Sequence, residues 1–459
     1  MTGTDILATL HDLLPHGSVS TADAAVVGRS VDASGAPPVG AALALVQPRS
    51  TEEVAAVVGA ANTAGVPVVP QGALTGLAGG ANAVAGALLL DLSALNRILR
   101  IDVDERLAVV QPGVTVAELA AAAAEHGLFY APDPASAEWA TIGGTIATNA
   151  GGMRCIKYGV TRDAVRSLEV VLADGSVVRT RPSTIKGVAG LDLTGLIVGS
   201  EGTLAVVTEA TLSLLPAPGP SRGISATFPT VAAGIAASNA IAAGPNVPST
   251  LELLDDVVLG AVDAYLPDAG IPTGAKAWVL AITDAVVGAD AELAAFERIF
   301  REHGAVAVDR ADDPADLDRL LVARRVFNQA MRALLGGSLN GDISVPRSRL
   351  LSVVERCAAL AAELDVVIAV GGHAGDGNLH PVVAFDPDNP AQVAAAHEAY
   401  RRISAIAQHL GGTMTGEHGV GIEKLAGLDG ELPARLRAVQ RSIKAVLDPN
   451  GILNPGKKL

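Results

Sequence analysis

The stretch QGALTGLAGG, Gln71 to Gly80, is the starting point for predicting the fold. It follows an apolar run, Val66 to Val69, that is typical of a short strand. Its four glycines let backbone N–H groups approach a phosphate closely and form an anion-binding concavity. The spacing is neither GxGxxG nor a Walker motif followed by lysine. The loop therefore predicts phosphate binding outside the nicotinamide Rossmann and ATP P-loop classes, with a flexible turn as the alternative.

Two later segments are also rich in small residues. Ala131 to Gly159 reads APDPASAEWATIGGTIATNAGGMRCIKYG, and Ile197 to Pro216 places Gly199, Glu201 and Gly202 before a strand-like run. Predicted helices and strands separate these segments from the first loop. Three such segments suit a long ligand bound between two subdomains.

Strand-like and helix-like segments alternate through the first half of the chain. Strands are predicted near Ala42–Val46, Leu88–Leu92 and Leu107–Gln111. Helices are predicted after two capping boxes, one at Ser50–Glu53 and one formed by Thr115 with Glu118. This pattern indicates a fold that contains both helices and strands.

A proline-rich break, LLPAPGP at 214–220, marks a predicted domain boundary. We expect residues 1–220 to form one domain, residues 221–412 a second, and residues 413–459 a C-terminal segment. A length of 459 residues agrees with more than one core.

Composition excludes several classes of function. The net charge of −15 argues against nucleic acid or an anionic membrane face as the main partner. Cys155 and Cys357 form no CxxC, so no iron–sulfur cluster or zinc knuckle is expected, and a reducing cytoplasmic setting fits best. No signal peptide is expected at the N-terminus. The uncharged stretch from Gly223 to Leu251 contains prolines and is rich in Ala, so we expect a buried helix at Val231–Ala243 and no transmembrane segment.

From about Pro37 to its end, the chain resembles the FAD-linked oxidases of the vanillyl-alcohol-oxidase and p-cresol-methylhydroxylase (PCMH) type. Within them it is similar to the group of D-lactate dehydrogenase, the glycolate oxidase catalytic subunit and D-2-hydroxyglutarate dehydrogenase. The resemblance implies an α+β fold. It has a PCMH-type FAD-binding domain of two subdomains, to which the C-terminal segment 413–459 returns, and a cap domain with an antiparallel sheet that binds substrate. The motifs that carry it are PQGALTGLAGG, PDPAS with TIGGTIATNAGG, KYG, GSEGTL, GHAGDGNLH, GEHGVGIEK and DPNGILNPGK.

The resemblance also implies which residues bind FAD. Gln71 stands where Arg is common, and Ala205 where the motif has its last Gly, but neither change removes a side chain that the chemistry needs. No histidine lies in the loop, so FAD is expected to be non-covalent. The implied residues are Gln71, Gly72, Ala73, Leu74, Thr75, Gly76 and Leu77 at the pyrophosphate, Pro132, Ser136, Thr141, Gly144, Thr148 and Gly151 along the flavin and ribityl chain, Glu201, Gly202 and Val207 near the adenosine half or under the pyrophosphate, and Asn454 in the tail.

The stretch GGHAGDGNLH, Gly371 to His380, holds two histidines seven residues apart. Two neutral imidazoles and one carboxylate form a divalent-metal site with an open position. Glu417, in GEHGVG, can supply the carboxylate, and the resemblance implies the same trio of His373, His380 and Glu417. The metal would be a divalent ion such as Zn or Mn. The alternative is that both histidines are hydrogen-bonded loop residues of a metal-free site.

His418 is the candidate general base, because imidazole titrates near working pH. A bound cation would ease loss of the proton from the substrate's hydroxyl, and the C2 hydride would then pass to flavin N5. His418 could act as the base with or without a metal.

A 2-hydroxy acid also needs a cation for its carboxylate. Arg324 lies where the resembling group carries such an arginine, and a guanidinium binds carboxylate through two bonds. Its neighbour Arg325 would point elsewhere on a helix, and a solvated arginine pair is the alternative. Asn328 and Asn340 occupy the positions where the hydroxyglutarate enzymes have a polar residue and a Lys, respectively. The absence of this Lys argues against a dicarboxylate and favours a smaller acid. Gly371, where an aromatic residue is common, could instead widen the pocket.

These expectations combine into one functional prediction. The chain would be an FAD-dependent dehydrogenase that oxidises a D-2-hydroxy acid, lactate- or glycolate-like, to the 2-oxo acid. Electrons would leave to an external acceptor such as a quinone, a cytochrome or an electron-transfer flavoprotein. A homodimer and peripheral association with the inner membrane are left open. The rival predictions are a flavoenzyme for another alcohol and a flavin-binding accessory subunit without turnover.

Overall fold

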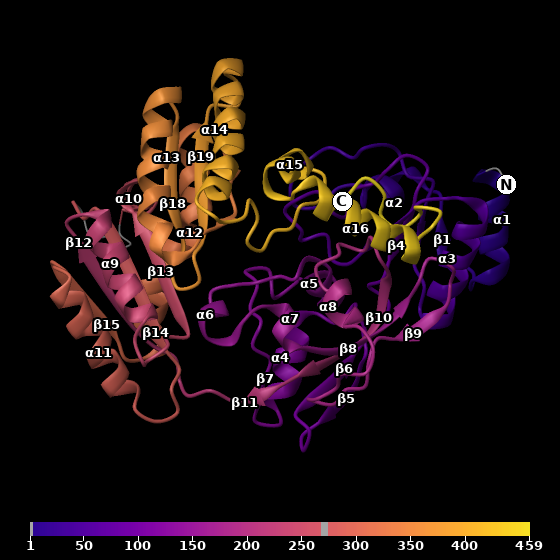
Figure 1. Ribbon diagram of the computed structural model, residues 1–459, viewed down its shortest axis with the longest axis horizontal. Helices are drawn as coiled ribbons and strands as arrows, with labels where there is room; N and C mark the ends of the chain where they lie inside the picture. The colour runs from indigo at the N-terminus through magenta and orange to yellow at the C-terminus, as the bar shows by residue number, and fades with distance from the viewer. Residues whose placement is uncertain (1–2, 268–273) are drawn as a thin grey trace. The chain divides into compact units, whose positions relative to one another are not determined.

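The computed structural model describes residues 3–267 and 274–459, which divide into two compact units (Figure 1). Unit 1 comprises Met1–Gly152, Gly159–Ala217 and Glu417–Leu459, and unit 2 comprises Met153–Tyr158 and Pro218–Gly416. The boundary at 217/218 falls inside the proline-rich break.

The short segment Met153–Tyr158, which the sequence assigned to the first domain, belongs to unit 2. Tyr158 Oη donates a hydrogen bond to Asp284 Oδ2 at 2.5 Å, and Lys157 forms an ion pair with the same carboxylate. Ile156 packs so closely on Gly375 that a Cβ there would lie 2.5 Å from Ile156 Cδ1. Contacts distant in sequence therefore place this segment, which is why the local pattern did not reveal it.

Unit 1 contains a sheet with the strand order β1-β2-β4-β3, in which β2, β4 and β3 run parallel. The leucines of β4 (Leu88–Asp91) face two apolar clusters in alternation, so every one of them is buried. The C-terminal tail lies beside β3 (Val68–Gln71): Val68 N–H donates to Ile452 O and Asn454 N–H donates to Val68 O, both at 2.8 Å. The tail is thereby attached next to the strand that leads into the glycine-rich loop.

A second sheet of unit 1 has the order β5-β6-β10-β8-β9 and is antiparallel. Its helix α4 (Val116–Ala124) begins with the predicted capping box, since Thr115 Oγ1 accepts the Glu118 N–H and the Glu118 carboxylate accepts the Thr115 N–H. The box predicted at Ser50 forms only in part. Ser50 Oγ accepts the Glu53 N–H, but the Glu53 carboxylate accepts the N–H of Arg49 instead of that of Ser50.

Unit 2 is built on an antiparallel sheet of order β15-β12-β14-β13-β18-β19-β16, with β17 paired to β19. Successive strand residues alternate between two apolar cores. One core includes residues of α9, α11, α13 and α14, and the other includes residues of α10 and α12. Figure 1 shows α13 and α14 beside β18 and β19. Because helices cover both faces, strands such as AWVLAIT at Ala277–Thr283 are continuously apolar.

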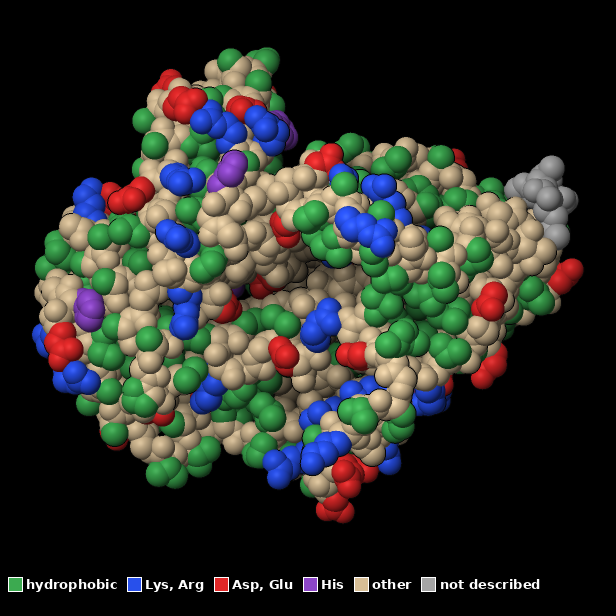
Figure 2. Space-filling model, in the orientation of Figure 1, with side chains coloured by type: hydrophobic (Ala, Val, Ile, Leu, Met, Phe, Trp, Pro, Cys, Tyr) green, Lys and Arg blue, Asp and Glu red, His purple; other side chains and the backbone are tan. Residues whose placement is uncertain are grey.

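The α+β fold class predicted from the sequence is confirmed. No helix within residues 3–267 and 274–459 is both long and apolar enough to cross a bilayer, and the uncharged stretch forms α9, Val231–Ala242. Figure 2 shows basic and acidic side chains interspersed on the visible face, so the net charge of −15 coexists with exposed basic groups.

The remaining bounds complete the description. In unit 1 they are α1 (Gly3–Leu13), β1 (Val19–Ser20), α2 (Asp23–Val27), β2 (Ala44–Val46), α3 (Thr51–Ala64), β5 (Ile98–Asp102), β6 (Leu107–Val110), β7 (Leu128–Phe129), α5 (Ile142–Thr148), α7 (Thr161–Ala164), β8 (Val165–Val171), β9 (Val177–Arg179), α8 (Leu193–Ile197), β10 (Val206–Ser213), β11 (Leu215–Pro216), η2 (Leu425–Gly427), α15 (Leu428–Glu431) and α16 (Ala434–Leu447). In unit 2 they are α6 (Cys155–Tyr158), β12 (Arg222–Phe228), β13 (Thr250–Asp255), α10 (Asp256–Tyr265), β14 (Ala277–Thr283), α11 (Ala289–Glu302), β15 (Ala307–Ala311), α12 (Pro314–Leu335), β16 (Gly337–Asn340), β17 (Ile343–Ser344), η1 (Arg347–Arg349), α13 (Leu350–Leu364), β18 (Val367–His373), β19 (Asn378–Phe385) and α14 (Pro390–His409).

Candidate functional site

Unit 1 encloses a cavity of about 530 Å³, which lies in the range of about 300–1,000 Å³ typical of small-molecule and cofactor sites. The three small-residue segments identified in the sequence form much of its wall. The lining includes Gln71, Gly72, Ala73, Leu74, Thr75, Gly76, Leu77, Ser136, Thr141, Gly144, Thr148, Gly151, Glu201, Gly202 and Val207.

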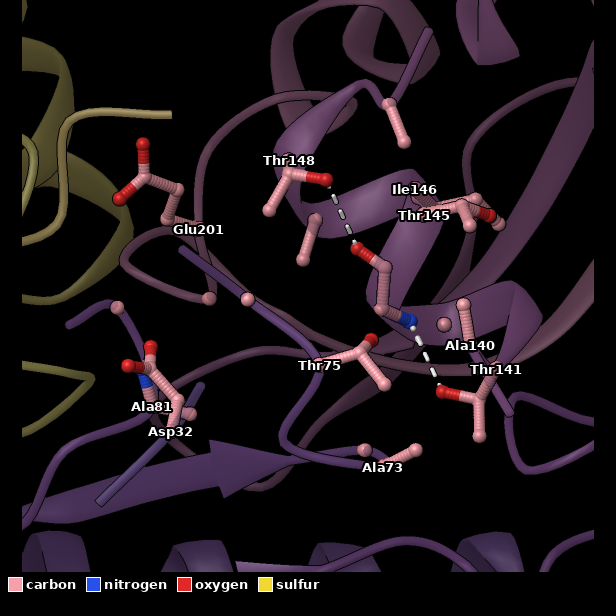
Figure 3. A pocket seen from close by; sticks show the side chains of 18 of the residues that line it. Asp32, Ala73, Thr75, Ala81, Ala140, Thr141, Thr145, Ile146, Thr148 and Glu201 are labelled. Atoms are coloured by element: carbon pink, nitrogen blue, oxygen red, sulfur yellow. Dashed lines mark hydrogen bonds between the residues drawn. The ribbon is translucent and has the colours of Figure 1, made fainter. Parts of the chain in front are cut away.

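Small residues are required where two of these segments meet. A Cβ on Gly72 would lie 2.4 Å from Thr141 Oγ1 and 3.8 Å from Gly144 Cα. Thr141 Oγ1 in turn accepts the Gly144 N–H at 3.2 Å, at the start of α5 (Figure 3). The glycine-rich loop therefore packs closely on the start of α5, and the main-chain groups of such a glycine-rich wall suit a phosphate-bearing ligand.

Gln71 lines the cavity with its backbone, because its side chain is occupied on the other side. Gln71 as a whole is 1% exposed. Its Nε2 donates to Arg29 O and Ala81 O, both at 2.8 Å, while its Oε1 accepts from Arg29 Nε at 3.2 Å. Gln71 thus ties together the two ends of the loop, a role that an amide fulfils with one donor and one acceptor group.

Glu201 has a different role from the one expected of a cofactor-contacting side chain. Its carboxylate accepts the N–H groups of Val420 and Gly421 at 2.8 and 2.7 Å, and Lys458 Nζ lies 3.2 Å from it. Figure 3 shows this carboxylate directed toward the C-terminal segment. Glu201 adopts a positive φ of 54°, a conformation that costs about 1–3 kcal/mol in a non-glycine residue. It therefore anchors the stretch that carries Glu417 and His418.

We expect Glu201→Gln to loosen that stretch. The amide offers one oxygen to two N–H donors and carries no charge, and a hydrogen bond to a charged group contributes about 1.5–3 kcal/mol. Amide hydrogen exchange in the peptide covering 417–423 should accelerate about 10- to 100-fold, measured by mass spectrometry. Glu209→Gln is the matched control, since Glu209 binds the surface residue Arg179 on the same sheet. Equal exchange in both variants would contradict this role.

Two predicted cofactor residues lie elsewhere. In the described part of the chain the cavity lining includes Pro134 but neither Pro132 nor Asn454. Asn454 Nδ2 donates to Gly80 O at 3.0 Å and to Glu201 O at 2.7 Å, so Asn454 supports the loop through its backbone. Lys457 also donates to Gly80 O; burial lowers its pKa to about 8, against the opposing charges of Asp32 and Glu201.

Glu417 and His418, which the sequence marked as a metal ligand and a base, both line the cavity of unit 1. Neither lies in a helix or strand. The residues that follow them fix their backbone, because the N–H groups of Val420 and Gly421 donate to the Glu201 carboxylate. Gly421 adopts a positive φ of 49°, and any Cβ there would overlap Ala78 O of the glycine-rich loop.

His373 and His380 lie on the β18–β19 hairpin of unit 2. Gly371 pairs with His380, and His373 pairs with Asn378, so the two imidazoles lie on the same face of the sheet. Their ring centroids are 5.1 Å apart at an interplanar angle of 87°. His373 Nδ1 contacts Glu252 Oε1 at 2.5 Å, and His380 Nδ1 lies 3.4 Å from Gly341 O. Both partners are acceptors, so each Nδ1 is placed to donate, and in the neutral imidazole the nitrogen that can bind a metal is then Nε2.

Gly371 does not widen a pocket. A Cβ on it would lie 2.7 Å from Leu254 Cδ2 and 3.1 Å from Phe327 Cε1, both buried in the core beneath α12. The position is therefore glycine because the sheet and α12 pack too closely for a side chain.

Arg324 and Arg325 are neighbours on helix α12, and their side chains have different partners. Arg324 Nε donates to Glu252 Oε2 at 2.6 Å, with the Arg324 side chain 18% exposed. Arg325 is exposed and pairs with Asp318. Burial would raise the pKa of Glu252, but the positive charges of His373, when it is protonated, and of Arg324 outweigh burial and lower that pKa to about 2. Arg324 therefore has an anionic partner and two further guanidinium nitrogens that carry donors.

Sequence reasoning missed two carboxylates of unit 2. Glu252 lies in the strand TLELLD between two leucines, and a charged residue at that position was the available signal. Asp342 accepts Asn378 Nδ2 at 2.9 Å, Thr415 Oγ1 at 2.8 Å and the Gly416 N–H at 3.0 Å. Nothing in the residues adjacent to Asp342 predicts that role, because its partners come from two distant segments.

Comparison with known families gives two matches. Residues 42–181 match the model described as "FAD binding domain", and residues 218–458 match "FAD linked oxidases, C-terminal domain". The second match begins at the boundary between the units.

Curated relatives align over most of the chain. The glycolate oxidase subunit GlcD of Bacillus subtilis (strain 168) is 40% identical over 415 residues, covering 90% of this chain and 88% of the relative. GlcD of Escherichia coli (strain K12) is 37% identical over 91% of this chain and 83% of its own. A D-lactate dehydrogenase of Archaeoglobus fulgidus (strain ATCC 49558 / DSM 4304 / JCM 9628 / NBRC 100126 / VC-16) is 36% identical over 90% of both.

Solved structures share the fold at low identity. A p-cresol methylhydroxylase with substrate bound aligns with a TM-score of 0.79 at 19% identity, over 99% of this chain and 96% of that one. An alkyldihydroxyacetonephosphate synthase aligns with a TM-score of 0.75 at 18% identity, over 99% and 85%.

Proposed function

Because this chain belongs to the FAD-linked oxidases, we propose that it is an FAD-dependent dehydrogenase that oxidises a small D-2-hydroxy acid, lactate- or glycolate-like, to the 2-oxo acid. Relatives at 36–40% identity bear the names glycolate oxidase subunit and D-lactate dehydrogenase, and both names denote 2-hydroxy-acid chemistry. Electrons are expected to leave to an external acceptor.

The observation that carries this proposal is the cluster of Arg324, Glu252 and His373 in unit 2. A 2-hydroxy acid presents a carboxylate and a neighbouring hydroxyl. A guanidinium next to an imidazole of metal-ligand geometry offers one group for each. A plain alcohol has no carboxylate and would not need Arg324.

In unit 1 the backbone of Gln71–Leu77 and the small side chains of α5 would hold FAD, consistent with the close packing of these two segments. When bound, the flavin supplies the acceptor for the hydride that leaves C2. The protein contributes position and charge: Arg324 binds the carboxylate, and His418 takes the proton from the C2 hydroxyl oxygen.

His373, His380 and Glu417 would hold a divalent ion. Such an ion supplies a Lewis acid that makes the substrate's hydroxyl more acidic. The two imidazoles fit this role because their Nδ1 atoms face acceptors. Chain connectivity supports Glu417 as the third ligand, since it directly follows Gly416, whose N–H binds Asp342 beside Asn378 of the hairpin.

The direct test is anaerobic mixing of the FAD-loaded protein with a panel of D- and L-2-hydroxy acids and simple alcohols. We expect loss of the flavin's visible absorbance with D-lactate or glycolate, and none with alcohols that lack a carboxylate. Bleaching by an alcohol alone, or by no member of the panel, would refute the proposal.

Two neighbouring arginines give a matched test of carboxylate recognition. Arg324→Gln should raise KM for the hydroxy acid, while Arg325→Gln should leave it unchanged, because Arg325 pairs with Asp318 at the surface. An equal KM in the two variants would remove Arg324 from the substrate site.

A further inference from the structure

Glu252 lies in the middle of β13 (Thr250–Asp255) and its side chain is completely buried. A carboxylate removed from water loses several kcal/mol of solvation unless well-placed partners compensate. The flanking residues Leu251 and Leu253 are also buried, in the core on the other face of the sheet. A charge in this position is an exception to the composition of the strand and requires a specific partner.

Both oxygens of Glu252 have such a partner. Oε1 contacts His373 Nδ1 at 2.5 Å, and Oε2 accepts from Arg324 Nε at 2.6 Å. The register explains the first contact, because Glu252 and His373 are directly opposed residues of β13 and β18. Helix α12 supplies the second, since Arg324 lies among the residues that pack on this face, such as Leu321 and Phe327.

These two bonds orient two different groups. The bond to Nδ1 fixes the tautomer and ring plane of His373 and directs its Nε2 lone pair away from Glu252. The bond to Nε fixes the plane of the Arg324 guanidinium, and the two terminal nitrogens carry further donors for a second carboxylate.

We propose that Glu252 is a positioning residue that couples metal binding at His373 to recognition of the substrate's carboxylate by Arg324. This inference rests on the proposed function. One rigid carboxylate connects the two groups, so an orientation that suits the metal ligand also presets the arginine. Because the same orientation suits both groups, we expect each event to favour the other, and thermodynamic linkage makes that effect reciprocal.

The test is Glu252→Gln, which keeps the shape of the side chain but offers one oxygen to two donors and removes the charge. Zn²⁺ affinity of the FAD-loaded protein, measured by titration without substrate, should fall about 10- to 100-fold. KM for the hydroxy acid should rise in the same variant, while FAD content stays at the wild-type level. Glu292→Gln is the matched control, since Glu292 binds Thr283 and belongs to α11 on the other face of the sheet.

A second variant covers the case in which Glu252→Gln does not fold. Glu252→Asp retains the charge and both acceptor oxygens but is one methylene shorter, so Zn²⁺ affinity and KM should both shift in the directions expected for Gln, by smaller factors. A shift in only one of the two constants, or in neither, overturns the coupling. If the wild-type protein binds no Zn²⁺, the metal part of the proposed function fails as well, whereas wild-type binding with unchanged variants refutes the coupling alone.

Discussion

His418→Asn is expected to slow anaerobic flavin reduction by about 10²- to 10⁴-fold, the usual contribution of a positioned general base. Asparagine preserves much of the shape and polarity of the imidazole but cannot accept a proton near neutral pH. The substitution should leave FAD content unchanged, because His418 is one of many residues along the cavity. Stopped-flow absorbance of the flavin measures the rate directly.

The control for this variant is His397→Asn, since His397 is exposed on α14. A global effect of losing a histidine would appear in both proteins, and the expected loss should appear only at position 418. Reduction of the His418→Asn protein at the wild-type rate would show that another group removes the proton.

Removal of the metal is expected to have an effect of similar size. Chelation, or His380→Ala, should abolish turnover while FAD stays bound. A site reduced to two protein ligands binds a divalent ion poorly, whereas the cavity that would hold FAD belongs to unit 1 and does not include His380 in its described lining. Elemental analysis gives the metal content, and the flavin spectrum gives the FAD content of the same sample.

Three further measurements complete this experiment. Adding Zn²⁺ or Mn²⁺ back to the chelated protein should restore turnover, but adding either to His380→Ala should not. His409→Ala, at the exposed C-terminal end of α14, should retain both metal and activity. Full activity in metal-free protein would support the alternative in which both imidazoles are hydrogen-bonded residues of a site without metal.

Much of the molecule could be predicted from short-range patterns. The glycine-rich loop, the capping box at Thr115 and the helix after Thr230 depend on residues within a few positions of one another, and such local preferences survive in the folded chain. The loop and the two small-residue segments were also recognisable as a ligand-binding set, because glycine at close-packed positions is a requirement of sterics.

The roles of individual carboxylates were not accessible in this way. Glu201 lies in a motif that suggested a contact with the cofactor, yet its carboxylate binds backbone N–H groups more than 200 residues later. Asp342 and Glu252 carry no local signal of their partners. A carboxylate accepts from whichever donors the fold brings near it, and sheet register and helix packing decide which donors those are.

The sequence by itself determined the alternation of helices and strands, the three segments that line the cavity and the types of side chain available for chemistry, because these follow from periodicity, turn geometry and composition. Only the tertiary structure decided that His373 lies opposite Glu252, that Arg324 and not Arg325 joins them, and that the C-terminal tail lies beside β3. The physical reason is that hydrogen bonds and ion pairs act over a few ångströms, and the chain brings residues 70 to 400 positions apart within that range only after its sheets have formed.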